Sequence, residues 1–128
     1  MELVSSPASE QALVQSYGPG QFKIGEQVYP RSILLFSGGV FQLDVESIDQ
    51  LNETVLERVF LANPKLDILL VGYGLSKGQV DCQLSNALRN AAIGFDIMNT
   101  GAACRTYNVL ALEERRVAAV VIPLKNLV

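Results

Sequence analysis

Four side chains that could take part in binding or catalysis lie within five consecutive positions, Cys104 to Asn108. At the first turn of a helix, the Cys104 thiolate would be stabilised by the helix dipole and by neighbouring Arg105, which would make the thiol reactive. Arg105 and Asn108 are three residues apart, so on a helix both can reach one partner. The alternative is structural: Cys104 packs as a small apolar side chain, Arg105 pairs with a carboxylate, and Tyr107 is buried with its hydroxyl hydrogen-bonded. We favour the structural alternative.

A second candidate is the glycine-rich segment "GYGLSKG", which begins at Gly72. Glycines at 72, 74 and 78 between a strand and a helix resemble a dinucleotide-binding fingerprint, in which backbone N–H groups hold a phosphate. Asp96 follows Gly78 by 18 residues, near the spacing of a ribose-binding acid. However, Asp96 falls near the start of its predicted strand rather than its end, and Asp81 already caps the following helix. We therefore favour a structural turn that lines a shallow cleft over an anion or nucleotide site.

The composition excludes most common catalytic designs. The chain of 128 residues has no histidine and two cysteines, which rules out Ser-His-Asp and Cys-His arrangements and leaves too few ligands for a closed zinc or iron–sulfur site within one chain. The net charge of −3 is unfavourable for nucleic-acid binding. We expect no cofactor and no metal, and we lean towards a non-enzymatic protein. Cys82, like Cys104, is expected to pack as an inert side chain.

The chain carries no obvious targeting segment. No stretch approaches the ~20 apolar residues that cross a bilayer, and the first residues lack the basic and apolar regions of a secretory signal. We therefore expect a cytoplasmic protein with reduced cysteines and no direct membrane insertion. Residues 1–16 are small and polar, which indicates a flexible N-terminal arm before a single domain over residues 17–128.

Apolar periodicity predicts an alternation of strands and helices. A hairpin is expected around Gly25-Glu26, and two further strands, 33–36 and 40–43, around a Gly-Gly turn. A helix that starts at Ser47 or, preferably, Asn52 should end at Asn63-Pro64. Then follow a buried strand in "KLDILLVGYG", a helix from Asp81 to a cap at Gly94, a strand in "FDIMN", a helix over 100–113 and a last strand in "RVAAVVIPL".

This order predicts an α/β domain with a mixed sheet, N-terminal hairpins and about three helices. On the third helix, one face with small side chains is expected to pack on the sheet: Ala102, Ala103, Thr106, Val109 and Leu110. On another face, Arg105 and Asn108 should hydrogen-bond backbone groups of the Gly72–Gly74 turn, because polar groups next to a core need partners. The run from Glu113 to Arg116 is expected to be a solvated helix end.

Four segments, "YGPGQFKI", "SILLF", "LLVGYG" and above all "NTGAACRTYNVLALEERRVAA", resemble the Mth-type domain of unknown function, which is the family of NADH:ubiquinone oxidoreductase (complex I) assembly factor 3. The similarity covers residues 17–123. It implies three layers, with helices on one face of a mixed sheet and a hairpin plus a helix on the other, and a non-enzymatic role in the biogenesis of membrane complexes. The matched positions are Gly72, Gly74, Thr100, Cys104, Arg105, Thr106, Tyr107, Asn108, Glu113 and Arg115.

The chain departs from the family pattern at two places. Tyr73 stands where the family has a threonine between two glycines, and Glu114 stands where it has a glycine. Without that glycine the helix end lacks the residue that most readily adopts a left-handed conformation.

Two hypotheses follow. The first is a binding or assembly module whose partners are other proteins, including components of respiratory complexes. The second is a small-molecule, nucleotide or anion binder, or an enzyme, that uses the Gly72–Gly78 turn together with Arg105 and Asn108. The candidate binding residues are Gly72, Tyr73, Gly74, Arg105, Tyr107 and Asn108.

Overall fold

A five-stranded mixed sheet forms the centre of the computed structural model, which describes residues 13–124. The strand order is β5-β4-β8-β6-β7. Strand β6 is parallel to β7 and β8, whereas β4 is antiparallel to β5 and β8. The strands are β4 (Ile33–Phe36), β5 (Gly39–Gln42), β6 (Ile68–Gly72), β7 (Gly94–Met98) and β8 (Val117–Val121). The expected α/β class with a mixed sheet is confirmed.

A second, antiparallel sheet is formed by β1 (Val14–Gly18), β2 (Gln21–Ile24) and β3 (Gln27–Tyr29). The hairpin expected at Gly25-Glu26 joins β2 to β3. Strand β1 begins inside the segment that we expected to be a flexible arm. The reason is that Val14 is buried and pairs with Ile24, so it belongs to the packed fold. The remainder of that arm, residues 1–12, lies outside the described residues.

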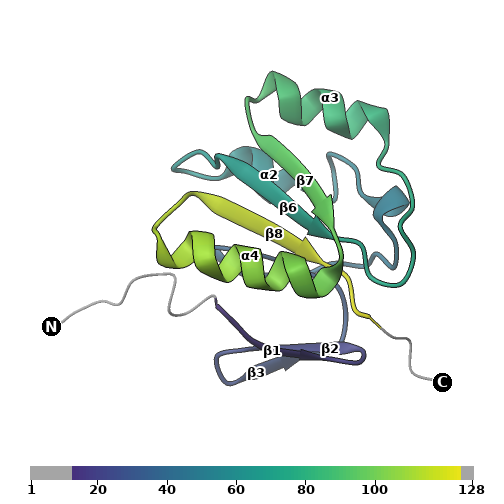
Figure 1. The fold of residues 1–128 in the computed structure, drawn as a ribbon. Helices are drawn as coiled ribbons and strands as arrows, with labels where there is room; N and C mark the ends of the chain where they lie inside the picture. Colours follow the sequence, from purple (N-terminus) through teal and green to yellow (C-terminus); the bar gives the residue numbers. More distant parts are fainter. Residues whose placement is uncertain (1–12, 125–128) are drawn as a thin grey trace, which may run out of the picture.

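The two faces of the central sheet carry different layers (Figure 1). Helix α3 (Cys82–Asn90) and the short helix α2 (Glu57–Leu61) lie on one face, and α4 (Thr100–Leu112) and the three-stranded sheet lie on the other. Along β6, Leu69 and Val71 point into the first core and Leu70 into the second. Because side chains alternate along a strand, the continuous apolar run of β6 fills both cores. The three layers implied by the family resemblance are confirmed.

The segment expected to be a helix from Asn52 to Asn63 is preceded by a short turn, as we preferred, but its α-helix covers only Glu57–Leu61. A single turn of 3-10 helix, η1 (Ile48–Gln50), is followed by Leu51 in an extended conformation with ψ of 136°. The Asn52 side chain accepts a hydrogen bond from the Val55 N–H at 2.8 Å and starts a separate turn before α2. The side chains that this segment buries are Ile48, Leu51, Leu56 and Val59. The step of five residues between Leu51 and Leu56 does not fit one helical face, so two short segments bury more apolar surface than one helix.

Helices α3 and α4 end in the same way, with a left-handed residue that is not glycine. Ala92 has φ of 58° and Glu114 has φ of 63°. After each of them the chain closes a Schellman motif, through the bond from Ile93 N–H to the Leu88 carbonyl at 2.9 Å and the equivalent bond from Arg115 to Leu110 at 2.9 Å. Gly94 is therefore not the cap of α3, as we expected, but the first residue of β7. Because Ile93 packs into the first core, the left-handed turn that ends α3 lies at Ala92, two residues before Gly94.

Candidate functional site

Thr100, the first residue of α4, connects the glycine-rich turn to the end of β8. The Gly74 N–H donates a hydrogen bond to Thr100 Oγ1 at 2.9 Å, and Oγ1 donates to the Ile122 carbonyl at 2.7 Å. The Thr100 side chain is fully buried, at 0% exposure. One hydroxyl thus satisfies two backbone groups from segments that are distant in sequence. The Asn99 side chain caps the same helix start by accepting from the Ala102 N–H at 2.8 Å.

The glycines of the turn make close contact with α4. A Cβ on Gly72 would lie 2.7 Å from Thr100 Cα and 3.0 Å from the Ala103 side chain. Gly74 has φ of +74°, and a Cβ there would lie 2.7 Å from Ile122 Cγ2. Tyr73 packs against the first core, and its N–H donates to the Met98 carbonyl at 3.0 Å. These contacts account for Gly72 through its close packing on α4, and for Gly74 through its positive φ and its close packing on Ile122.

Arg105 fixes the first strand of the small sheet. Its Nη1 donates to the Tyr17 hydroxyl at 2.7 Å. A Cβ on Gly101 would lie 2.6 Å from the same hydroxyl, so the glycine leaves room for the tyrosine. The guanidinium is exposed to solvent, and the bond spans 88 residues of sequence. Tyr17, which we did not place among the candidate binding residues, is therefore part of the candidate site.

Asn108 closes the free edge of β1. Its Oδ1 accepts from the Val14 N–H at 2.9 Å, and its Nδ2 donates to the Val14 carbonyl at 2.8 Å. The carboxamide therefore pairs with β1 as a neighbouring strand would, and it satisfies an edge that would otherwise be open. Our expectation that Arg105 and Asn108 bond the Gly72–Gly74 turn is wrong. The turn lies at the N-terminal end of α4, where Thr100 and Ala103 reach it, whereas residues 105 and 108 lie further along and face β1.

The buried face of α4 also differs from the expected one. The side chains that it packs against the second core are Ala103, Cys104, Tyr107 and Ala111, and Val109 is 54% exposed. The expected face was chosen for its small and aliphatic residues. The actual orientation is decided by Tyr107, whose ring fills the space between the two sheets and is only 1% exposed.

The two cysteines lie in opposite environments. Burial raises the pKa of Cys104 to about 12, and the opposing effect of the Arg105 charge is smaller. The thiol therefore stays protonated at neutral pH, which favours the packing role over the reactive one. Burial also raises the pKa of Tyr107. Cys82, which we expected to be packed, is exposed at the first turn of α3, because Leu84 and Leu88 form the buried face of that helix.

Helices α3 and α4 do not flank a common cleft, because they lie on opposite faces of the central sheet (Figure 1). The Asp81 side chain accepts from the Gln83 N–H at 3.2 Å, as expected for the cap of α3. Asp96 lies in the middle of the edge strand β7. A ligand that contacts both the start of α3 and Arg105 is therefore incompatible with this arrangement.

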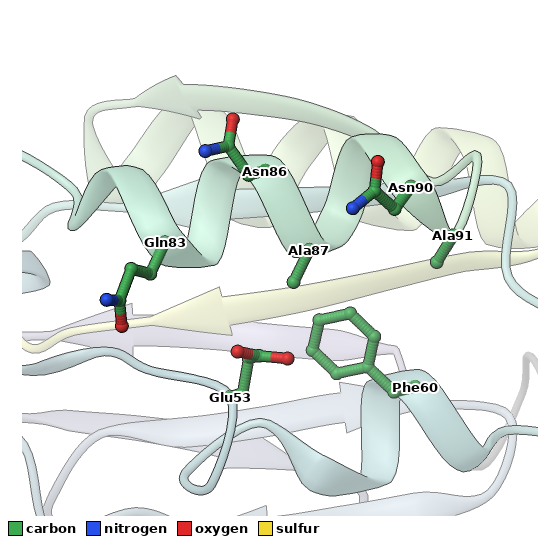
Figure 2. A pocket seen from close by; sticks show the side chains of 7 residues that line it. All are labelled: Glu53, Phe60, Gln83, Asn86, Ala87, Asn90 and Ala91. Carbon is green, nitrogen blue, oxygen red and sulfur yellow. The ribbon is translucent and has the colours of Figure 1, made fainter.

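Two cavities lie elsewhere. One, of about 550 Å³, separates α3 from the segment before it, and in Figure 2 the Phe60 ring lies opposite Ala87 while Glu53 lies opposite the carboxamide of Gln83. The other, of about 640 Å³, lies beyond the carboxyl ends of β6 and β8 and includes Arg31 and Ser76 in its lining. The residues that line each cavity come from distant segments of the chain. A local sequence motif therefore cannot predict either cavity.

Further features limit what the described residues can do. Among residues 13–124, no group of three His, Cys, Asp or Glu side chains is placed to hold a metal ion. Over the same range, no helix has both the length and the apolar character to cross a membrane.

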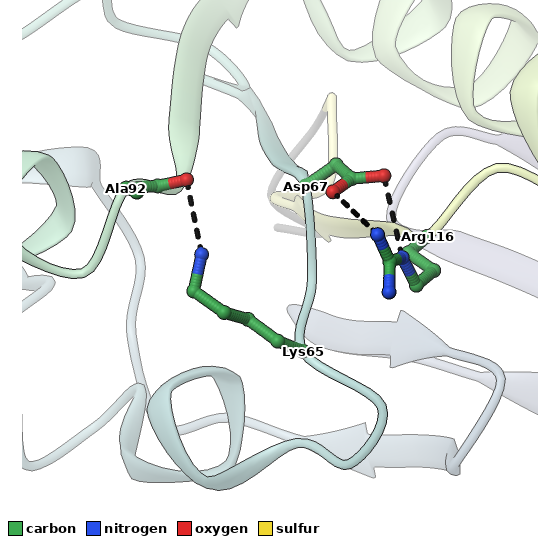
Figure 3. Close-up of polar contacts among 4 residues, drawn as sticks. All are labelled: Lys65, Asp67, Ala92 and Arg116. Atoms are coloured by element: carbon green, nitrogen blue, oxygen red, sulfur yellow. Dashed lines mark hydrogen bonds and ion pairs between the residues drawn. The ribbon is translucent and has the colours of Figure 1, made fainter.

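The exposed turn at the end of α4 is held by an ion pair between Arg116 and Asp67 at 3.2 Å, close to the bond from Lys65 to the Ala92 carbonyl (Figure 3).

Known proteins are similar to this chain in sequence and in fold. The zebrafish (Danio rerio) "NADH dehydrogenase [ubiquinone] 1 alpha subcomplex assembly factor 3" is 24% identical over 123 residues, which cover 96% of this chain and 71% of the relative. The human protein of that name is 27% identical, and the match covers 96% of this chain and 67% of the relative. A "13 kDa major membrane protein" of Francisella tularensis is 27% identical over 110 residues, which cover 84% of this chain and 88% of the relative.

Solved structures and a family model agree with these relatives. The crystal structure of an outer membrane protein from Bartonella henselae matches with a TM-score of 0.80 and 30% identity, over 90% of this chain and 97% of that one. A Mth938-like domain from Bordetella pertussis matches with a TM-score of 0.77 and 25% identity, over 98% and 94% of the two chains. The family model described as "Protein of unknown function (DUF498/DUF598)" matches residues 14–122, and the chain belongs to this family.

Proposed function

We propose that this chain is a non-enzymatic assembly module that binds other proteins during the biogenesis of a respiratory NADH:ubiquinone oxidoreductase. The observation that carries the proposal is the extent of the match to relatives named as assembly factors of that enzyme. The match to the zebrafish protein covers 96% of this chain, so it includes the whole three-layer domain and not one isolated motif.

The hydrogen bonds that the polar side chains of α4 make within the domain support this role. Thr100 bonds the backbone at Gly74 and Ile122, while Arg105 and Asn108 bond β1. These side chains therefore connect α4 to both sheets and make a rigid scaffold. A rigid scaffold that presents a fixed outer surface suits a binding module, because little ordering is required when a partner binds.

The proposed partner is a membrane enzyme, and a module of this kind would contact it from the water-facing side. Some relatives are named as membrane proteins, whereas the described part of this chain contains no helix suited to cross a bilayer. Association through protein contacts at the membrane surface accommodates both observations.

Deletion of the gene tests the proposal. Membranes from the deletion strain are separated on native gels, and the NADH-oxidising complex is detected by in-gel activity and by an antibody to one subunit. We expect loss of the full-size complex, accumulation of subcomplexes, and recovery when the wild-type gene is returned. A succinate-oxidising complex from the same membranes is the control. Normal levels of the full-size NADH-oxidising complex in the deletion strain would refute the proposal.

The location of one cavity supports a second candidate, a small anionic ligand. The cavity of about 640 Å³ lies beyond the carboxyl ends of β6 and β8, where ligands bind in open α/β sheets, and Arg31 contributes a cation to its lining. Thermal-shift measurements with nucleotides and anionic metabolites test it. A ligand at 100 times its Kd stabilises by about 2.7 kcal/mol. The stabilisation should disappear in Arg31→Ala, and a flat screen would reject this candidate.

A further inference from the structure

The outer face of α4 presents three exposed side chains in a row. Arg105, Val109 and Leu112 follow one another at helical spacings of four and three residues, so they lie on one stripe opposite the buried face. Val109 is 54% and Leu112 is 60% exposed. The stripe thus combines one cation with two large aliphatic side chains on a helix whose other face is fixed in the core.

Among residues 13–124, Arg105 is held in place without an acidic partner. One nitrogen donates to Tyr17, and within residues 13–124 the ion pair that forms is the one between Arg116 and Asp67, at the other end of the helix. The remaining N–H groups of the guanidinium are available to a planar, bidentate acceptor such as a carboxylate. The Tyr17 bond reduces the entropy that Arg105 would lose on binding, because it already restrains the side chain.

A groove beside the guanidinium has room for an acidic side chain. It has a volume of about 370 Å³, and residues from β1, including Gln15, Ser16 and Tyr17, line it together with Arg105 and Asn108 of α4. The groove offers hydroxyl and amide donors next to a cation, and no carboxylate from the described part of the chain lines it. A carboxylate that enters it would gain hydrogen bonds as well as charge attraction.

We propose that the α4 stripe, formed by Arg105, Val109 and Leu112, docks an amphipathic helix of a protein partner. The partner helix would carry an Asp or Glu for Arg105 and two aliphatic residues for Val109 and Leu112. With a rise of ~1.5 Å per residue, the aliphatic contacts lie about 6 Å and about 10 Å from the acidic one along the axis. A second helix provides side chains at the same spacings, so its ridges fit the stripe. The identity of the partner as a component of a respiratory complex rests on the proposed function, but the chemistry of the surface does not.

The charge of Arg105 favours an acidic partner. The chain as a whole carries a net charge of −3, so the attraction of an acidic segment depends on local cations such as Arg105 and not on the overall field. Such a contact contributes more to orientation and partner choice than to affinity, whereas the two aliphatic residues supply buried apolar area.

Site-specific photo-crosslinking in living cells tests the inference. A photo-reactive phenylalanine analogue replaces Val109 in the full chain, and the captured segment is identified by mass spectrometry. The same analogue in place of Leu61, which is 72% exposed on the other side of the molecule, is the control position. We expect position 109 to capture a defined segment that has an acidic residue and two aliphatic residues at helical spacing. Position 61 should not capture it.

Charge variants complete the test. Arg105→Glu should reduce the yield of the captured segment at least tenfold, and an acid-to-Arg change in that segment should restore it. The matched control is Arg89→Glu on α3, which reverses an exposed charge on the opposite face and should change the yield less than twofold. Thermal unfolding confirms that each variant is folded. If Arg105→Glu disturbs β1, Leu112→Asp serves as the second variant, because Leu112 makes no bond to Tyr17. Leu112→Asp should lower the yield of the captured segment to the same extent.

The possible outcomes separate this inference from the proposed function. A captured segment with the expected pattern, but from a protein unrelated to respiratory complexes, would support the docking surface and refute the proposed function. If the deletion strain lacks the full-size NADH-oxidising complex, yet Arg105→Glu and Leu112→Asp restore it fully, the docking surface is wrong. Absence of capture at position 109, or capture insensitive to both variants, would also overturn it.

Discussion

Replacement of Thr100 by valine, which exchanges a hydroxyl for a methyl group, should destabilise the domain strongly. The Thr100→Val side chain keeps its shape but loses the hydroxyl that accepts from Gly74 at 2.9 Å and donates to Ile122 at 2.7 Å. The Gly74 N–H and the Ile122 carbonyl would then remain buried without partners. Each such group costs about 1–3 kcal/mol. We therefore expect the free energy of unfolding to fall by about 2–4 kcal/mol, a large share of the ~5–15 kcal/mol typical of a domain.

Urea denaturation measures this effect. For a slope of about 1.5 kcal/mol per M, a loss of 3 kcal/mol lowers the midpoint by about 2 M. Thr106→Val is the matched control, because Thr106 is half-buried on the same helix and makes neither of these bonds. Thr100→Ser keeps the hydroxyl and loses one methyl, so its cost should stay near 1 kcal/mol.

Amide hydrogen exchange gives a local readout of the same bond. In the wild-type protein the Gly74 amide should exchange slowly, and in Thr100→Val its protection should fall more than that of neighbouring amides. The reasoning fails if Thr100→Val unfolds at the same urea concentration as Thr106→Val while the Gly74 amide stays protected. Water would then replace the hydroxyl, and the turn would not depend on Thr100.

Three further predictions concern helix ends and buried groups. Stability should be insensitive to the Cys104 thiol below pH 8 and should decline between about pH 9 and pH 12, towards a limit of about 1.4 kcal/mol per pH unit, because this thiol ionises near 9 when unfolded and near 12 when folded; denaturation at pH 7 to 10 should show the onset of the decline, and Cys104→Ala should reduce it, whereas Cys82→Ala should not. Ala92→Gly should raise the urea midpoint by the equivalent of about 0.5–1 kcal/mol, because φ of 58° is unfavourable for alanine; a lower midpoint would show that the turn is not strained. Tyr107→Phe should leave stability unchanged or slightly higher, because burial raises the pKa of the hydroxyl and a buried hydroxyl without a hydrogen-bond partner among residues 13–124 is unfavourable; a loss above about 1 kcal/mol would reveal a hydrogen bond.

Local patterns in the sequence determined most of the element order. The continuous apolar run of β6 predicts a strand buried on both faces, and Asp81 predicts the start of α3, where its side chain indeed accepts from Gln83. The hairpin around Gly25-Glu26 follows from alternation over a few residues. These features were predictable because each depends on interactions between residues that are close in the chain.

The ends of two helices were harder to predict, because they depend on which apolar side chains the core can bury as well as on the local sequence pattern. Helical spacing in residues 48–59 fits a longer helix, but the α-helix begins only at Glu57, after an extended Leu51 and a turn that starts at Asn52. Similarly, Gly94 was the obvious helix cap, yet the burial of Ile93 places the left-handed turn at Ala92. In both cases the gain from burying aliphatic side chains outweighed local preference.

The sequence alone identified the cluster from Thr100 to Asn108 as the most distinctive part of the chain. Only the tertiary structure decided what its residues contact. Arg105 meets Tyr17 across 88 residues of sequence, and Asn108 meets Val14 across 94. A helix repeats every 3.6 residues and so fixes which side chains share a face, but not which face the core takes. That choice depended on where the Tyr107 ring could be buried between two sheets, and it left Arg105, Val109 and Leu112 facing solvent.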